Sequence, residues 1–203
     1  MNSLLLAALL TTTPLEAPKP RQLPIVIVDL AFGLLASSFV HESGHALGIK
    51  VLDNAKLTEY TPYPTRCGSR YSNGCVEFIP SAGDSDRSRL IMQPMGMLAT
   101  RVASEGWDLL GNRDFTGPKA DQMLAALYLT SRLDSFQYVL RGAIKSWTGS
   151  PTDRSWDPQG VISSITKDRT KQNWMYIGTV ALLALDLILD WDEVSTNWNR
   201  LWI

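Results

Sequence analysis

A long apolar segment runs without a break into a pair of closely spaced histidines. Leu23–Val40 reads LPIVIVDLAFGLLASSFV and is followed at once by HESGHALGIK. About 18 apolar positions are just enough for a helix to span the hydrocarbon core of a bilayer. Pro24 stands near the start, where proline is tolerated in a helix. Asp29 interrupts the run, so a buried helix of a soluble protein is the alternative interpretation.

A second apolar segment, Trp174–Trp191, lies near the C-terminus. Tryptophans at both of its ends are typical of residues that anchor a helix at the two membrane interfaces. Asp186 and Asp190 lie inside it, and an acid within a membrane helix is a functional candidate. The alternative is a helix that faces a protein interior, where these acids would be paired.

The polar segment Lys56–Pro80 is rich in Thr, Tyr, Pro and Gly and predicts two or three short strands. Asn73-Gly74 within it is a strong signal for a hairpin turn. Cys67 and Cys75 flank this turn and would face each other across the hairpin, as a disulfide or as two thiols. A disulfide would place the loop in an oxidising compartment.

Helical patterns follow at Ser88–Leu110 and Ala120–Trp147, and Asp157-Pro158 resembles a helix start with an aspartate cap. The sequence therefore predicts a mainly helical α+β fold. Its order would be an apolar helix ending in the histidines, a small hairpin or sheet insertion, and a helical bundle with a C-terminal apolar helix.

The length of 203 residues favours one domain, which we assign to residues 23–203. Residues 1–22 form a separate N-terminal segment, a signal or an anchor, with an apolar run at Leu4–Leu10 that no Lys or Arg precedes. The net charge of -1 argues against a nucleic-acid partner, because such proteins are normally basic.

The histidines belong to an HExxH motif, His41-Glu42-Ser43-Gly44-His45. Residues four apart lie on one face of a helix, so the imidazoles of His41 and His45 can converge on one metal ion. Two imidazoles and a carboxylate, with a fourth position for water, suit catalytic Zn²⁺. Glu42 projects about 100° away around the helix axis and can act as general base on that water.

The third zinc ligand must be an acid, because the chain has no other histidine. The extended motif that supplies a third His matches as far as Gly48 but has Val51 at its last position. Cys67 and Cys75 are less favoured as ligands. The four acids that remain open are Asp157, Asp134, Asp186 and Glu105; pairing with Arg132 is the other interpretation of Asp134.

An apolar helix leading directly into HExxH resembles the site-2 protease family of membrane-embedded zinc proteases. That family has a Leu-Asp-Gly motif at the start of a later helix, and its Asp is the third zinc ligand. Trp156-Asp157-Pro158-Gln159-Gly160-Val161-Ile162 is similar in layout, with Asp-Pro in place of Asp-Gly. The segment QPMGMLATRVASE is similar to the small-residue helix that follows the family's strands. The resemblance implies that Asp157 completes the site.

We therefore expect a membrane-associated zinc metalloendopeptidase that acts on a protein or peptide substrate, one that is itself anchored in the lipid membrane. Two alternatives stay open. One is a compact soluble or secreted zinc hydrolase with Glu105 as third ligand. The other is a non-catalytic membrane protein in which HExxH binds a metal for stability or recognition.

Two sequence features bear on the orientation in a membrane. Lys167, Arg169 and Lys171 precede the last apolar segment, whereas acids follow it. The excess of positive charge in cytoplasmic loops then predicts that residue 172 is cytoplasmic. A Cys67–Cys75 disulfide would place the hairpin on the outer side.

Overall fold

The computed structural model describes residues 22–53, 55–68, 70–80, 85–111, 117–148 and 157–202. The predicted signal or anchor falls almost wholly outside them. The fold is mainly helical α+β, as predicted. The helical elements are α2 (Leu23–Leu47), the π-helical turn η1 (Gly48–Asp53), α3 (Ser85–Gly111), α4 (Pro118–Trp147), α5 (Asp157–Ile165), α6 (Arg169–Leu189) and α7 (Trp191–Trp202). The strands are β1 (Lys56–Thr61), β2 (Thr65–Cys67), β3 (Arg70–Ser72) and β4 (Cys75–Ile79).

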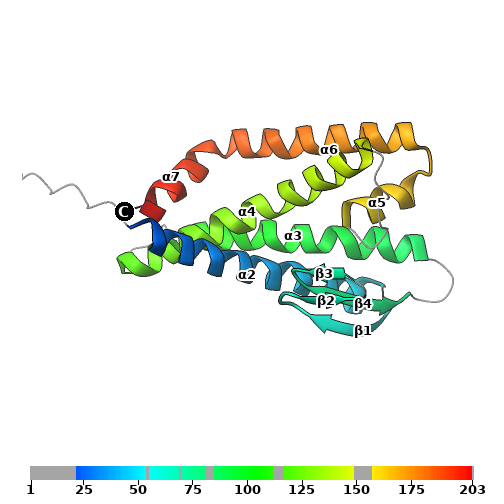
Figure 1. Cartoon of the computed structure of the whole chain (residues 1–203), viewed down its shortest axis with the longest axis horizontal. Coiled ribbons are helices and arrows are strands. Elements are labelled where there is room, and N and C mark those ends of the chain that lie inside the picture. The colour runs from blue at the N-terminus through cyan, green and yellow to red at the C-terminus, as the bar shows by residue number, and fades with distance from the viewer. Residues whose placement is uncertain are drawn as a thin grey trace, which may run out of the picture.

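The helices form an elongated bundle with the strands at one end (Figure 1). α2 and α3 run antiparallel and in contact, and α4 packs against both of them. α6 and α7 lie along the other side of α4. The strands cover the C-terminal end of α2, where the HExxH motif lies.

Three helices begin at or close to the predicted residues, whereas α3 begins at Ser85 in place of Ser88 and α6 at Arg169 in place of Trp174. Pro24 occupies the first turn of α2, α4 covers the whole of Ala120–Trp147, and α5 begins at Asp157. The side chain of Asp168 accepts hydrogen bonds from the backbone N–H groups of Thr170 and Lys171, which caps α6. The matches at α2 and α5 follow from local signals, since first-turn prolines act within a few residues; the Asp168 cap was not predicted.

The helix α2 buries a narrow stripe of small and polar residues and exposes its large apolar ones. The buried stripe contains Val26, Asp29, Gly33, Ser37, His41, Glu42, Gly44 and His45. The exposed set contains Leu23, Ile25, Ile27, Val28, Phe32, Leu34, Leu35, Phe39 and Leu47. Gly33 lets α2 approach α4, because a Cβ there would lie 2.7 Å from Oγ1 of Thr130.

The two apolar helices are each long and apolar enough to cross a membrane, by length and composition. Only 22% of the apolar window in α2 and 6% of that in α6 is buried in the protein. In α6, Tyr176 is buried, whereas most of the large apolar residues are exposed: Trp174, Ile177, Leu182, Leu185, Ile188 and Leu189. A soluble core helix of this composition would normally be mostly buried.

The prediction of a hairpin at Asn73-Gly74 is wrong. β4 pairs with β1 and β3 pairs with β2, so Asn73-Gly74 links strands of two different sheets. The turn between β2 and β3 contains Gly68, which has a φ of 58°. Gly74 has no positive φ, which a type I′ hairpin turn would require. The segment therefore forms four short strands where two or three were predicted.

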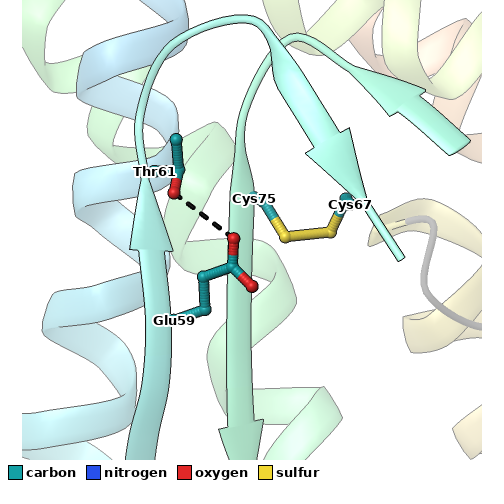
Figure 2. Close-up of a disulfide and its surroundings, with 4 residues drawn as sticks. All are labelled: Glu59, Thr61, Cys67 and Cys75. Atoms are coloured by element: carbon teal, nitrogen blue, oxygen red, sulfur yellow. Dashed lines mark hydrogen bonds between the residues drawn. A yellow bond between two sulfur atoms is a disulfide. The ribbon is translucent and has the colours of Figure 1, made fainter. Parts of the chain in front are cut away.

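Cys67 and Cys75 form a disulfide. Figure 2 shows that it joins β2 to β4 and so fastens the two small sheets together. The pairing matches one of the two predicted alternatives. Its place differs from the prediction, because the disulfide links the sheets and does not bridge the two strands of one hairpin.

Candidate metal centre

The two histidines of the motif lie on one buried face near the end of α2. His41 is 1% exposed and His45 is 4% exposed. Their ring centroids are 4.7 Å apart, with the ring planes 80° from parallel. The helical spacing thus brings the imidazoles together as the sequence predicts.

Gly96 of α3 marks the point on which both imidazoles converge. A Cβ on residue 96 would lie 2.6 Å from Nε2 of His41 and 2.6 Å from Nε2 of His45. Both Nε2 atoms therefore border the same small space, the one that a Cβ on residue 96 would occupy. Because residue 96 is a glycine, the two imidazoles can converge there without colliding with a side chain.

The outer nitrogens of both rings have partners that fix the orientation of the rings. Nδ1 of His45 lies 2.9 Å from the carbonyl oxygen of Met92. A carbonyl only accepts, so Nδ1 of His45 donates, and its Nε2 keeps a lone pair in the neutral ring. Nδ1 of His41 lies 2.6 Å from Oδ2 of Asp134. With Nδ1 donating to this carboxylate, Nε2 of His41 is likewise an acceptor.

This donor set fits Zn²⁺. Metal-binding histidines typically donate their second ring N–H to a carboxylate or a backbone carbonyl, as both rings do here. His41 and His45 would hold the ion through Nε2, and a carboxylate would complete the protein ligands.

Asp134 belongs to a buried network on α3 and α4. It is 4% exposed. Besides His41, it accepts a hydrogen bond from Nε2 of Gln137 at 3.3 Å, and Oγ1 of Thr100 lies 3.5 Å from its Oδ2. The ring of Tyr138 stacks on His41, with centroids 4.7 Å apart and planes 15° from parallel. Asp134 does not pair with Arg132, which was one sequence-based interpretation.

Glu42 is buried, 7% exposed, beneath the strand layer. A Cβ on Gly74 would overlap Cγ of Glu42 and lie 2.8 Å from its Oε1. Next to it, the hydroxyl of Tyr60 on β1 lies 2.7 Å from Oγ of Ser43. The strands thus cover the glutamate side of the motif, whereas α3 covers the histidine side.

The glycines inside and after the motif permit the close contact between α2 and α3. A Cβ on Gly44 would overlap the carbonyl oxygen of Met95, and one on Gly48 would lie 2.8 Å from Cγ of Met95. Gly48 therefore has a packing role, although it was noted in the sequence for its place in an extended metal motif.

Asp157, the predicted third ligand, is the first residue of α5, and its side chain lies outside the described part of the structure. Neighbouring residues fix where α5 lies. Oγ of Ser164 donates to Oδ1 of Asp86 at 3.3 Å, and a Cβ on Gly160 would overlap the amide of Gln93. From these contacts, α5 runs antiparallel to α3.

Two of the other candidate acids, Glu105 and Asp186, lie in an ion-pair cluster between α3, α4 and α6. Glu105 pairs with Arg101 and Arg132. Asp186 lies 3.3 Å from Arg101 and 3.0 Å from Arg132. Glu105 is nine residues beyond Gly96, about 13 Å along the helix axis. These acids are engaged away from the histidine pair.

Among the described side chains, groups of three potential ligand atoms within 4.8 Å of one another occur at two places, and neither includes His41 or His45. One contains the disulfide-bonded Cys67 and Cys75, whose sulfurs are already bound to each other. The other is Glu105, Asp190 and Glu193, beside the arginines of the ion-pair cluster. The histidine pair has no third described ligand atom at this range, so its third ligand stays a prediction.

Sequence reasoning missed Gly96, Gly74 and the carbonyl of Met92. A glycine gives no local sign that it faces a site 50 residues away, and a backbone carbonyl carries no residue-type signal at all. The small-residue pattern of QPMGMLATRVASE indicated a close helix contact but did not identify the position that faces the histidines.

We compared the chain with protein-family models, with curated proteins and with solved structures, and found no match. Its function is therefore argued from the geometry of the site.

Proposed function

We propose that this protein is a membrane-associated metalloprotease that hydrolyses peptide bonds with Zn²⁺ held by His41, His45 and Asp157. The observation that carries the proposal is the convergence of both Nε2 atoms on the space in front of Gly96. Glu42, buried on the strand side of the motif, would supply the base that hydrolysis needs.

Glu42 moves the proton in the proposed reaction. A zinc ion supplies Lewis acidity, which lowers the pKa of water and polarises a peptide carbonyl. The Glu42 carboxylate accepts a proton from water as the water oxygen bonds to the carbonyl carbon. When the C–N bond breaks, Glu42 returns this proton to the leaving nitrogen. The products are a carboxylic acid and an amine.

The register of α5 on α3 supports Asp157 as the third ligand. Gly160 packs against Gln93. Because the two helices are antiparallel, one further turn along each leads from Gln93 to Gly96 and from Gly160 to Asp157. From this register we infer that the start of α5, at Asp157, approaches the space that the two histidines border.

The surface of α2 supports a location in the lipid membrane. A helix in lipid typically buries small and polar residues against its neighbours and exposes large apolar ones, and α2 has this pattern. A substrate that reaches the site from the bilayer would be a membrane-anchored protein.

Two expectations for the orientation came from the sequence: residue 172 in the cytoplasm, and the disulfide-bonded strands on the outer side. In this fold the two expectations conflict. Lys167, just before α6, lies 3.3 Å from Asp86 near the start of α3, at the strand end of the bundle (Figure 1). We infer from this contact that residue 172 and the strands lie on the same side of the membrane. The Cys67–Cys75 disulfide favours the oxidising side for both.

The alternatives have less support. In the soluble hydrolase, Glu105 would be the third ligand, but it pairs with Arg101 and Arg132 instead. In the non-catalytic protein, the buried Glu42 would have no chemical role.

The substitution Glu42→Gln tests the catalytic proposal. The detergent-solubilised protein is assayed for cleavage of a quenched fluorescent peptide library and of casein, with zinc content measured in parallel. We expect Glu42→Gln to lose turnover by about 10²-fold or more with zinc retained. Glu77→Gln, on the exposed side of β4, is the matched control and should keep full activity. Equal turnover in Glu42→Gln and wild type would contradict the proposal.

The third ligand is tested by Asp157→Ala, with Asp168→Ala as the control because Asp168 only caps α6. We expect Asp157→Ala to lower zinc affinity strongly and to abolish proteolysis. Unchanged zinc affinity would exclude Asp157 as a ligand.

Alkaline extraction of native membranes tests the location: the protein should stay in the pellet, and release without detergent would favour the soluble hydrolase.

A further inference from the structure

We propose that Asp134 is a positioning residue that orients His41 for metal binding and is not itself a ligand. This inference rests on the proposed zinc site. It assigns a role to a buried carboxylate that the reaction described above does not use.

The geometry of the His41–Asp134 pair carries the inference. Oδ2 of Asp134 lies 2.6 Å from Nδ1 of His41, whereas Nε2, on the far side of the ring, borders the space at Gly96. The carboxylate and the proposed ion would thus contact opposite sides of one imidazole. Asp134 would hold the proton on Nδ1 and leave the Nε2 lone pair directed at the ion.

Asp134 is itself held in place. Gln137 on α4 donates a hydrogen bond to Oδ1 of Asp134, and the hydroxyl of Thr100 on α3, whose nearest acceptor is the carbonyl of Met97 at 3.0 Å, lies 3.5 Å from Oδ2. To become a metal ligand, Asp134 would have to leave Gln137 and His41 and move around the imidazole ring. A buried carboxylate that accepts from His41 on one oxygen and from Gln137 on the other is better suited to set the angle of His41.

The ring of Tyr138 limits the remaining freedom of His41. It stacks on the imidazole with the planes 15° from parallel. The carboxylate therefore restrains the imidazole in its plane, and the stacked ring restrains rotation out of it. Together they aim Nε2 before a metal binds, which lowers the entropic cost of binding.

The experiment compares zinc affinity and coordination in Asp134→Asn and wild type. Asp121→Asn is the matched control, because it makes the same change on the same helix, about 20 Å away along the axis. Zinc dissociation constants are measured by competition with a chromogenic chelator in detergent. X-ray absorption at saturating zinc then gives the ligands around the ion.

We expect Asp134→Asn to raise the zinc dissociation constant about 10–100-fold, as loss of such an outer partner typically does. At saturating zinc it should still bind one ion with the same ligands as wild type, and Asp121→Asn should match wild type in both measurements. Gln137→Leu removes a donor to Asp134 and should raise the constant by a smaller factor. It replaces Asp134→Asn in the test if that variant does not fold.

Two results would overturn the inference while the zinc proposal stands: wild-type affinity in Asp134→Asn and Gln137→Leu, or a missing oxygen ligand in Asp134→Asn at saturation. The second would make Asp134 a ligand. Wild-type protein that binds no zinc would instead remove the proposed function, and this inference with it.

Discussion

Gly74 lies directly against the side chain of Glu42, so close that a Cβ on residue 74 would overlap Cγ of the glutamate. The packing of Gly74 therefore holds the Glu42 side chain in place on the strand side of the site. Cys75, the next residue, is 1% exposed and is held by the disulfide. The covalent link, the strand layer and the proposed base form one connected unit.

Gly74→Ala should lower turnover and leave zinc binding intact. The added methyl group must displace either β4 or the Glu42 side chain. Because Glu42 is the proposed general base, its displacement would slow proton transfer. We expect kcat to fall at least about tenfold, within the range that a general base contributes. Gly178→Ala on α6, where a Cβ would meet nothing within 4 Å, should retain wild-type kcat. Loss of zinc from Gly74→Ala would show that the strands support the metal site as well.

The double variant Cys67→Ser/Cys75→Ser should be less stable than wild type. A disulfide that closes a loop of this length contributes about 2–3 kcal/mol to the free energy of unfolding. Thermal unfolding in detergent measures the loss. A reducing agent should lower the wild-type midpoint by a similar amount and leave the double variant unchanged.

The same disulfide allows the orientation to be tested in native membranes. If the strand end faces the oxidising side, maleimide-polyethylene glycol should modify Cys67 and Cys75 only after reduction. Modification of the untreated wild-type protein would place this end in a reducing compartment.

Gly96→Ala should strongly weaken zinc binding. Its Cβ would lie 2.5 to 2.6 Å from ring atoms of both histidines, in the space where the ion is proposed to bind. We expect a zinc dissociation constant at least about tenfold higher, as for the loss of a supporting group at a metal site. Gly106→Ala, on the same helix with nothing within 4 Å, should bind zinc normally and gain about 0.5–1 kcal/mol of stability. Equal zinc affinity in both variants would argue against an ion at Gly96.

Glu193→Gln should stabilise the protein at neutral pH. Partial desolvation, then the negative charges of Glu105 and Asp108, raise the pKa of Glu193 above its usual range. The folded state then binds a proton more tightly than the unfolded state. Stability is therefore lost as the pH rises from the ordinary glutamate pKa of about 4.3 through the raised value.

The difference in unfolding midpoint between Glu193→Gln and wild type should be positive at pH 7 and shrink toward pH 4. Glu77→Gln controls for the loss of one negative charge. A difference that is constant across this pH range would contradict the assigned cause.

The sequence predicted the parts of this fold that depend on local signals. The HExxH spacing fixed the shared face of His41 and His45, and Asp157-Pro158 marked the start of α5. The strand pairing was predicted wrongly, because Asn73-Gly74 has the composition of a hairpin turn but packs against Glu42 in the tertiary structure. The preference of Asn-Gly for a hairpin turn stabilises the local structure less than the contact of Gly74 with Glu42 does here.

The partners of the histidines were beyond sequence reasoning for a related reason. Asp134 is 93 residues from His41, and its neighbour Arg132 suggested a simple ion pair. On a helix, residues two apart point about 200° from each other around the axis. Arg132 accordingly faces Asp186 and Asp190, whereas Asp134 faces His41. Only the packing of α4 between α2 and α6 shows that Arg132 and Asp134 have different partners.

The zinc content of the purified protein tests the central claim most directly. Metal analysis of detergent-solubilised wild type, His41→Ala and His45→Ala should give close to one zinc per chain in the wild type and almost none in either variant. Glu42→Gln should retain the ion, which separates loss of a ligand from loss of the base. Wild-type protein without zinc, or full zinc occupancy in His45→Ala, would contradict the account.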